Sequence, residues 1–351
     1  MRVLGGGTLR LQLAPAPAGL FMLSGHVFLP VLSFARMSAI DRIVFFGTPE
    51  FAVSTLAALV AAGRAPVRVV TQPARPAGRG QRPQDPPVAR WAREQNLPVA
   101  MPERVRDPAF LEDLAALAPD VAVVVAFGQI FPRALLDLPR LGCINLHASL
   151  LPRWRGASPI QAAMAAGDRQ TGVSTMRMEA GLDTGPVLLE EATEIGPEET
   201  AGELSRRLAE TGGRLMVRTL QELERGDLVP RPQALEGATY APRLSRESGR
   251  VDWSLTALEI HHRLRAYTPW PGLTAELRGA PVKILAAEVL TDKEADGAAG
   301  TYLGLRGGRL AVTTDGGTIL GIGELQRPGK RALSASDFAN GERLQLGERF
   351  S

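Results

Sequence analysis

The sequence is poor in the residues that form disulfides and bind transition metals. Its 351 residues include one cysteine, Cys143, and four histidines, His26, His147, His261 and His262. A single cysteine cannot form an internal disulfide, which favours a reducing compartment. The histidines and the cysteine show no spacing typical of a zinc site. We therefore predict no bound metal and a cytoplasmic location.

Lysine is also scarce, because only three of the 40 basic residues are lysines, and the formal net charge is +3. Arginine in place of lysine is explained either by genome composition or by phosphate binding, for which the planar guanidinium is better suited. The overall charge is a poor indicator of nucleic-acid binding. Local clusters of arginine are the better evidence for or against a nucleic-acid site.

Acidic residues are missing from residues 1–40, and His26 is the only titratable residue in the stretch 11–35. A signal peptide or a membrane anchor is one interpretation. Three prolines interrupt the apolar run, however, and Met37 lies directly before the first expected strand. We interpret residues 1–40 as an over-extended start or as a disordered or cleaved leader, and we expect no membrane association.

The phosphate-binding motifs of nucleotide enzymes are missing, because neither G-x-G-x-x-G after a strand nor G-K-[ST] occurs. Short β-branched runs instead alternate with helical stretches. Strands are expected at residues 43–46, 67–72, 120–128 and 142–148. This alternation predicts an α/β fold with a doubly wound, mostly parallel sheet. A long helix at about residues 197–228 closes the first predicted domain, residues 41–228.

A second domain is expected because single cores stop growing at about 250–300 residues. Residues 229–248 show no periodicity and are interpreted as a linker. Residues 251–272 predict one helix ended by prolines, and short strand candidates with glycine-rich turns follow. This pattern indicates a small antiparallel β-barrel, and we assign residues 249–351 to a C-terminal domain.

Two polar side chains, Asn145 and His147, end the strand expected at residues 142–148. Residues two apart on a strand point to the same side, and ligands of open α/β sheets bind beyond such strand ends. Acyl transfer to an amine needs a donor for a developing oxyanion and a group that takes a proton. Asp183, in the glycine-flanked turn GLDTGPVL, is the candidate carboxylate that orients the imidazole.

Taken one at a time, these residues have simpler explanations. Asn145 is then an amide at a strand end, His147 a structural histidine and Asp183 a turn residue. We interpret Cys143 as a small buried strand residue and not as a nucleophile, because no sequence neighbour is suited to lower its pKa. His261 and His262 are adjacent on an expected helix and are interpreted as core and surface residues and not as catalytic groups.

The surrounding residues resemble a known family. INLHASLLPRWRGASPIQ and GLDTGPVL are similar to the two signatures of the folate-dependent formyltransferases. FFGTPEF, TQPARPAGRG, VVVAFG, LPRLGCIN, DWS and PWPG extend the resemblance to the methionyl-tRNA formyltransferase family, over nearly all of residues 42–335. Ala148 stands where many relatives have glycine, and residues 1–40 have no counterpart.

The resemblance implies that 10-formyltetrahydrofolate, as co-substrate, donates its formyl group to the α-amine of methionine on initiator tRNA. Asn145 and His147 would then stabilise the oxyanion, while Asp183 would hold the imidazole and help to remove the amine proton. Folate and initiator Met-tRNA are the implied partners, and the C-terminal domain is implied to be an oligonucleotide-binding-type barrel that contacts the tRNA. We expect a monomer.

The resemblance also implies which residues line the folate pocket. Ser149, Leu150, Leu151 and Pro152 match the pocket-lining segment of the family, and VVVAFG would form the opposite wall. Without the resemblance, a hydrophobic turn that covers the sheet edge explains the same four residues about as well.

Four arginines are implied to contact the tRNA. Arg75 and Arg79 lie in the Pro- and Gly-rich loop 71–90, where a solvated loop is the alternative on composition alone. Arg79 is the first choice for reading the acceptor stem, and Arg75 for a phosphate contact. Arg153 and Arg155 lie beside the predicted active site, where they would hold the terminal nucleotides.

Three other functions remain open at this stage. A formyltransferase that acts on a small amine, such as glycinamide ribonucleotide or an amino sugar, would share Asn145, His147 and Asp183. A hydrolase that passes the formyl group to water would share them too. A non-catalytic RNA-binding module belongs to a different class, and it would bind tRNA without folate-dependent turnover. The loop 71–90 and the second domain favour a tRNA substrate over a small amine.

Overall fold

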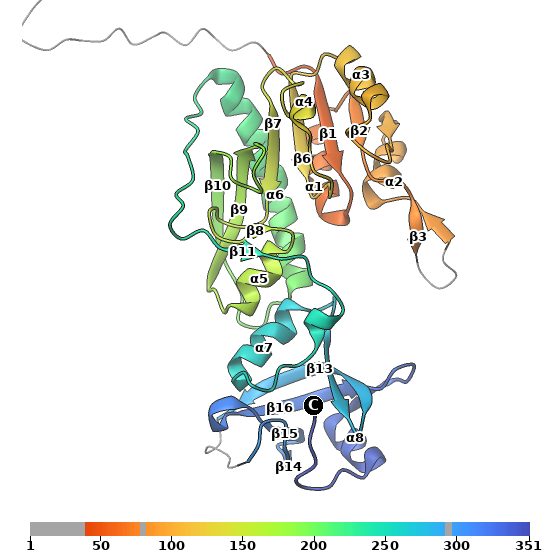
Figure 1. Ribbon diagram of the computed structural model, residues 1–351, viewed down its shortest axis with the longest axis vertical. Helices are drawn as coiled ribbons and strands as arrows, with labels where there is room; N and C mark the ends of the chain where they lie inside the picture. Colours follow the sequence, from red (N-terminus) through yellow and green to blue (C-terminus); the bar gives the residue numbers. More distant parts are fainter. Residues whose placement is uncertain (1–38, 78–81, 292–296) are drawn as a thin grey trace, which may run out of the picture. The chain divides into compact units, whose positions relative to one another are not determined.

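The computed structural model describes residues 39–77, 82–291 and 297–351, all of which belong to one compact unit (Figure 1). The leader predicted at residues 1–40 lies outside the described residues except for its last two positions. Among the helices that the structure describes, none combines the length and the apolar character that a membrane crossing requires.

A seven-stranded sheet forms the centre of the first domain. Its order is β10-β9-β7-β6-β1-β2-β5. The parallel strands are β1 (Ile43–Gly47), β2 (Arg68–Val70), β5 (Val99–Ala100), β6 (Val121–Val125) and β7 (Cys143–His147). At one edge, β9 (Gln170–Arg177) and β10 (Val187–Glu194) form an antiparallel pair. The predicted mostly parallel sheet is confirmed.

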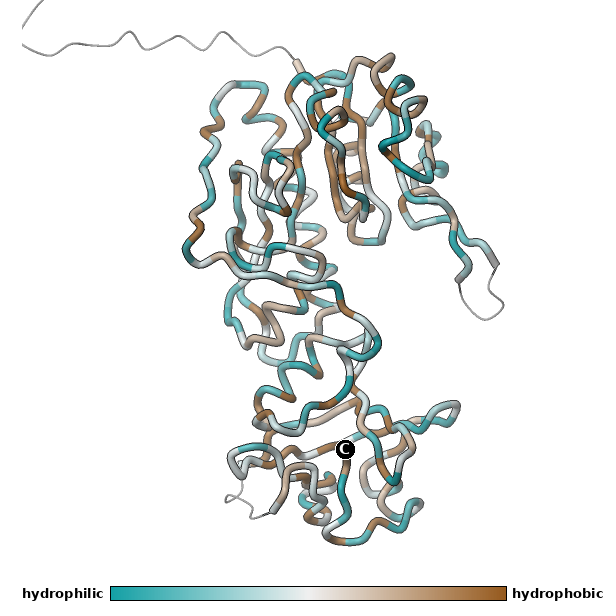
Figure 2. The backbone as a smooth tube through the Cα atoms, viewed as in Figure 1, coloured by the Kyte–Doolittle hydropathy of each residue, from teal (hydrophilic) through white to brown (hydrophobic). Residues whose placement is uncertain are grey.

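Both faces of this sheet are buried, which explains the continuous apolar runs of its strands. Along β1, Ile43 and Phe45 join one hydrophobic cluster, while Val44 and Phe46 join another on the opposite face. Figure 2 shows the hydrophobic residues along the central strands β1 and β6. The sheet is therefore doubly wound, as the alternation of strands and helices predicts.

The helices divide between the two clusters. The larger cluster includes residues of α1 (Glu50–Ala61), α2 (Pro87–Glu94), α5 (Pro159–Ala165) and α6 (Ala201–Arg225). The smaller cluster includes residues of α3 (Pro108–Ala116) and α4 (Arg133–Leu136). Gly213 in α6 lets this helix approach α1 closely, because a Cβ there would lie 2.9 Å from the carbonyl oxygen of Ser54.

The segment after α6 pairs with strands of the first domain. Arg231 pairs with Val187 at the edge strand β10. Further on, β11 (Tyr240–Ala241) pairs in parallel with β8 (Arg155–Gly156). The residues interpreted as a linker therefore run along the sheet edge and return to the residues that follow β7.

The C-terminal part contains an antiparallel sheet of order β12-β13-β16-β15-β14, with β17 paired to β16. Its elements are β12 (Leu273–Leu277), β13 (Ala280–Leu290), β14 (Tyr302–Arg306), β15 (Arg309–Thr313), β16 (Ile319–Gln326), β17 (Ala332–Ser334) and the helix α8 (Ala335–Glu342). Ser351 exchanges two backbone hydrogen bonds with Glu276 in β12, and Phe350 donates one to Gly300. The antiparallel sheet is confirmed, and its closure into a barrel stays a prediction.

The helix predicted over residues 251–272 is wrong in its length, because α7 spans Ala257–Ala266. Thr256 and Glu259 form a capping box, in which the threonine hydroxyl accepts from the backbone N–H of Glu259 and the glutamate accepts from that of Thr256. A threonine cap satisfies free N–H groups of a first turn, so the helix begins at Ala257 and not six residues earlier.

Candidate active site

Asn145 and His147 lie at the carboxyl end of β7 and face one cavity of about 660 Å³. Asn145 is half-buried, and His147 is 5% exposed. Asp183, from the turn between β9 and β10, lines the same cavity. The structure thus brings together the three residues that the sequence singles out for catalysis.

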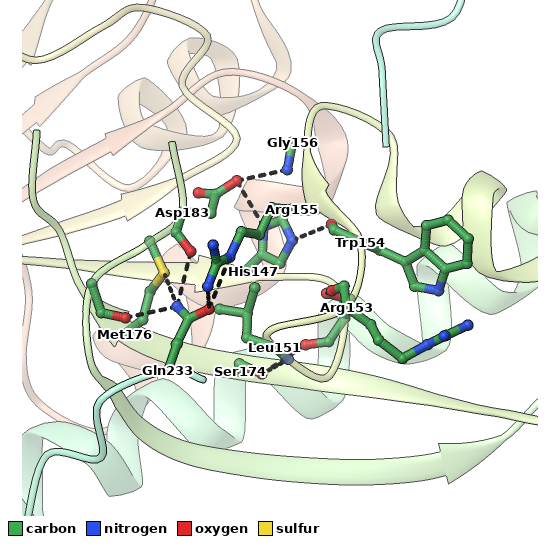
Figure 3. Close-up of polar contacts among 12 residues, drawn as sticks. His147, Leu151, Arg153, Trp154, Arg155, Gly156, Ser174, Met176, Asp183 and Gln233 are labelled. Carbon is green, nitrogen blue, oxygen red and sulfur yellow. Dashed lines mark hydrogen bonds and ion pairs between the residues drawn. The ribbon is translucent and has the colours of Figure 1, made fainter. Parts of the chain in front are cut away.

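The imidazole of His147 has one nitrogen committed to the backbone (Figure 3). Its Nε2 lies 2.8 Å from the carbonyl oxygen of Trp154. Since a carbonyl oxygen only accepts, Nε2 carries the proton of this hydrogen bond. Nδ1 is left for chemistry, and it lies 3.7 Å from Oδ2 of Asp183.

Asp183 is held by backbone groups. Its Oδ2 accepts a hydrogen bond of 2.8 Å from the N–H of Gly156, and its own backbone has a φ of 51°. Gly156 has a φ of 120°, and a Cβ there would lie 2.5 Å from the carbonyl oxygen of Ala241. Only glycine therefore fits where the donor to Asp183 stands.

The Asn145 amide makes no hydrogen bond to any protein group in the described part of the chain. A half-buried amide without a protein partner costs free energy unless water or a ligand satisfies it. Its N–H groups are therefore available to an acceptor in the cavity.

One wall of the cavity is the loop after β6, which begins at Ala126 and ends at Phe131. The carbonyl oxygen of Phe127 accepts hydrogen bonds from Thr48 Oγ1 at 3.2 Å and from Gln72 Nε2 at 2.7 Å. The motifs FFGTPEF, TQPARPAGRG and VVVAFG therefore meet here, at the carboxyl ends of β1, β2 and β6. The rings of Phe127 and Phe131 pack edge-to-face on Phe46 and anchor the loop.

The cavity is mostly apolar and open at its rim. The remaining lining residues are Pro49, Phe51, Val124, Leu146, Ala148, Gly156, Ala157, Pro159, Ile160, Gln161, Met176, Met178, the stretch 179–182 and Ser205. Two large apolar side chains at the rim are exposed, Ile130 at 92% and Leu182 at 62%. Such exposed apolar side chains beside a cavity are typical of a ligand site.

The four residues predicted to bind folate do not line this cavity. The hydroxyl of Ser149 donates to the carbonyl oxygen of Arg153, and the N–H of Leu151 donates to Ser174 Oγ. Leu151 is buried and clusters with Met176, which does line the cavity. The turn Ser149–Pro152 thus lies behind the cavity wall, and its contact with folate stays a prediction.

The four arginines predicted to contact tRNA differ in exposure. Arg75 is exposed on a hairpin formed by β3 (Arg75–Ala77) and β4 (Arg82–Gln84), and Arg79 lies outside the described residues. Arg153 is exposed and pairs with Asp168 at 2.7 Å.

Arg155 does not suit the predicted contact with nucleotides. It is 3% exposed, and its Nε and Nη2 donate to Oε1 of Gln233 at 3.0 and 2.7 Å. The buried guanidinium therefore bonds to Gln233 within the protein, and Arg155 connects the segment after β7 to the segment after α6.

Comparison with known proteins identifies the family. Residues 41–220 match the formyl transferase family, and residues 243–343 match the formyl transferase C-terminal domain. A methionyl-tRNA formyltransferase of Gluconobacter oxydans is 51% identical over 310 residues, which cover 88% of this chain and 99% of the relative. This chain belongs to the methionyl-tRNA formyltransferase family. A relative of the same name from Halorhodospira halophila is 49% identical, with 88% of this chain and 98% of that protein covered.

Solved structures share the fold of this formyltransferase family member. WlaRD, a sugar 3N-formyltransferase crystallised with dTDP and 5-N-formyl-THF, has a TM-score of 0.60 at 16% identity and covers 84% of this chain and 100% of its own. HypX from Aquifex aeolicus, in complex with tetrahydrofolic acid, has a TM-score of 0.56 at 17% identity and covers 90% of this chain and 49% of its own. The family resemblance stated from the sequence is confirmed.

Two further residues contact the site and were missed by sequence reasoning. Gln233 and Thr239 lie in the segment interpreted as a linker, where neither periodicity nor a chemical motif singles them out. Gln233 binds the carbonyl oxygen of Asp183, and Thr239 binds the N–H of Trp154. Only the fold brings them to the site, so no local signal could have found them.

Cys143, two residues before Asn145, is buried as predicted, and burial raises the pKa of its thiol to about 12. A thiol that stays protonated at neutral pH is a poor nucleophile. We therefore expect Cys143→Ser to retain kcat within about threefold of the unchanged protein, since small buried substitutions away from the reacting atoms act on stability. A loss of turnover with unchanged folding would contradict the structural role; steady-state kinetics and thermal unfolding measure the two.

Proposed function

We infer that this chain transfers the formyl group of 10-formyltetrahydrofolate to the α-amino group of methionine on initiator tRNA. The observation that carries the inference is the cavity in which Asn145, His147 and Asp183 meet. It lies in a chain about half identical to relatives named methionyl-tRNA formyltransferase over nearly their whole length.

The cavity suits a folate. A flat pterin ring needs an apolar slot with a few polar groups, and about 660 Å³ lined by Phe127, Ile130 and Met176 provides one. When bound, 10-formyltetrahydrofolate would supply a formyl carbon that the amine can attack. The new C–N bond would form while the bond from the formyl carbon to N10 breaks, and tetrahydrofolate would leave after N10 takes up the proton that the amine releases. We place the pterin between the loop 126–131 and the stretch 179–183, with the turn Ser149–Pro152 supporting the slot from behind.

Asn145 stabilises the oxygen that becomes negative during transfer. Its amide N–H₂ has no protein partner in the described chain, so no bond must be broken before it donates. A preorganised donor inside a mostly apolar cavity is worth more than the same donor in water.

His147 and Asp183 handle the proton. Nδ1 is the one ring nitrogen not bound to the backbone, so it is the atom that takes the proton of the attacking amine. The carboxylate of Asp183, 3.7 Å away, stabilises the resulting imidazolium. Because an amine is already a competent nucleophile, no covalent intermediate with the protein is needed.

The finer assignments rest on position and exposure. We assign Arg75, Arg79 and Arg153 to tRNA contacts, with Arg153 set beside Trp154, the residue that holds His147. The proposed division of the chain is a catalytic domain of residues 41–228, a linker of residues 229–248 and a C-terminal domain of residues 249–351. We also propose a cytoplasmic monomer, since one chain supplies the whole candidate site.

Incubation with 10-formyltetrahydrofolate and either initiator or elongator Met-tRNA tests this function. We expect formyl-Met-tRNA from the initiator and little from the elongator. Release of formate without formylated tRNA would indicate the hydrolase, and formylation of a small amine instead of tRNA would indicate the other transferase class. Binding of tRNA with no folate-dependent turnover would indicate an RNA-binding module.

A further inference from the structure

We propose that the segment 231–241, which follows α6, positions the catalytic residues: Gln233 sets the Asp183 turn, and Thr239 sets the carbonyl group that holds His147. Neither residue is among the described residues that line the cavity. They therefore act through other residues and are positioning residues. The activity readouts below rest on the proposed function, whereas the spectroscopic readout does not.

Gln233 uses its whole side-chain amide to join two segments (Figure 3). Its Nε2 donates to the carbonyl oxygens of Asp183 at 2.8 Å and Gly185 at 2.7 Å. Its Oε1 accepts both hydrogen bonds of the buried Arg155. An amide has two donors and one acceptor oxygen with two lone pairs, so Gln233 is fully satisfied.

The Asp183 turn needs such an external support. A φ of 51° is uncommon for a residue other than glycine, and it persists only where the surroundings hold it. Three hydrogen bonds do so, because Gln233 holds two carbonyl groups of the turn and Gly156 donates to the carboxylate. Since Gly156 follows Arg155, Gln233 fixes both the donor and the acceptor of that last bond.

Thr239 acts on the other catalytic side chain. Its Oγ1 accepts a hydrogen bond of 2.9 Å from the N–H of Trp154, and its carbonyl oxygen accepts one of 2.9 Å from the N–H of Arg155. Trp154 has a φ of 60°, and its Nε1 donates to Asp168 at 2.7 Å. These bonds hold the Trp154 carbonyl oxygen where it accepts the hydrogen bond from Nε2–H of His147.

The two contacts therefore set the relation between Nδ1 of His147 and the carboxylate of Asp183. A displacement of catalytic groups by about 1 Å lowers the rate about a hundredfold, even when the substitution that causes it lies far from the reacting atoms. The substrate-lining residues stay in place, so the effect falls on kcat and not on binding.

A pair of substitutions at Thr239 tests the first half of this proposal. Thr239→Val keeps the shape but removes the acceptor for Trp154, whereas Thr239→Ser keeps the hydroxyl. We expect Thr239→Val to lower kcat about 10–100-fold, with KM for both substrates within about threefold. Thr239→Ser should restore most of kcat. The matched control in the same segment is Arg231→Gln, which removes an exposed ion pair with Glu190 and should leave kcat unchanged.

Nuclear magnetic resonance of protein labelled with ¹⁵N-histidine reports on the hydrogen bond between His147 and the Trp154 carbonyl group without any substrate turnover. The Nε2–H signal of His147, assigned by its loss in His147→Asn, should shift or exchange faster in Thr239→Val. It should be unchanged in Thr239→Ser and in Arg231→Gln. An unchanged signal in Thr239→Val, or an equal change in all three variants, would overturn the proposal.

Gln233→Glu tests the second half. The glutamate keeps the acceptor for Arg155 but directs an oxygen, in place of N–H₂, at two carbonyl oxygens. We expect kcat to fall about 10–100-fold in this variant. The double variant Gln233→Glu with Asp183→Asn should have a kcat less than about threefold below that of Asp183→Asn alone. The effects of two residues that act through one another do not add. If the loss of kcat in the double variant equals the product of the two single losses, this assignment is overturned.

The outcomes remain separable. If the unchanged protein does not formylate Met-tRNA, the proposed function fails while the histidine spectra still decide on Thr239. If Gln233→Glu does not fold, judged by circular dichroism, the Thr239 pair still decides whether the segment positions the site. Normal kcat and spectra in both variants would show that the segment has a merely structural role.

Discussion

Asn145→Ala is expected to lower kcat by about 10²–10³-fold, the usual cost of removing one oxyanion donor. The amide lines the cavity at the carboxyl end of β7 and has no protein partner in the described chain, so its removal leaves the fold intact. Because the donor acts on charge that develops during transfer, KM should change little. Steady-state kinetics with 10-formyltetrahydrofolate and initiator Met-tRNA measure both quantities.

Two further substitutions sharpen this result. Asn145→Asp keeps the shape but replaces a donor by a negative charge, and it should lose at least as much kcat as the alanine variant. Asn340→Ala changes an exposed asparagine of α8 and should behave as the unchanged protein. A near-normal kcat in Asn145→Ala would exclude the amide from the chemistry.

Asp183→Asn should lower kcat by about 10²–10⁴-fold, the range for loss of a positioned acid–base partner. The asparagine oxygen can still accept from the N–H of Gly156, so the turn keeps its shape. What disappears is the negative charge 3.7 Å from Nδ1 of His147, which stabilises the imidazolium. Kinetics and thermal unfolding together separate a loss of charge from a loss of fold.

The matched control is Asp113→Asn, which removes a half-exposed carboxylate paired with Arg68 at the surface. Exposed pairs contribute about 0–1 kcal/mol, so this variant should match the unchanged protein in turnover and nearly in stability. If Asp183→Asn turns over within about fivefold of the unchanged protein, the carboxylate has no part in proton transfer, whose contribution is far larger.

Several structural features follow from local patterns alone. The near-continuous apolar run at residues 120–128 predicts a strand buried on both faces, and the shorter β6 (Val121–Val125) is such a strand. The two-residue period of a strand places Asn145 and His147 on one side of β7. Prediction from local patterns is less exact for α7. The helical pattern starts at residue 251, whereas the helix starts only after the capping box of Thr256 and Glu259.

Burial changes the interpretation of two segments near the site. The sequence places Arg153 and Arg155 side by side with the same chemistry, but in the structure the first is exposed and the second is 3% exposed. Arg153 lies before β8 and pairs with Asp168, whereas Arg155 lies in β8, beside β11, and donates to Gln233. The turn Ser149–Pro152 likewise lies behind the cavity wall, since its polar groups bind Arg153 and Ser174.

By itself the sequence determined the family, the α/β class of the first domain and the three residues at the cavity. Strand periodicity and sequence motifs depend only on residues that are close together in the chain. Only the tertiary structure decided that Gln233 and Thr239 belong to the site. Gln233 lies 78 residues from its partner Arg155. A hydrogen bond between such distant positions depends on how the chain returns across the sheet edge, and that return leaves no local pattern.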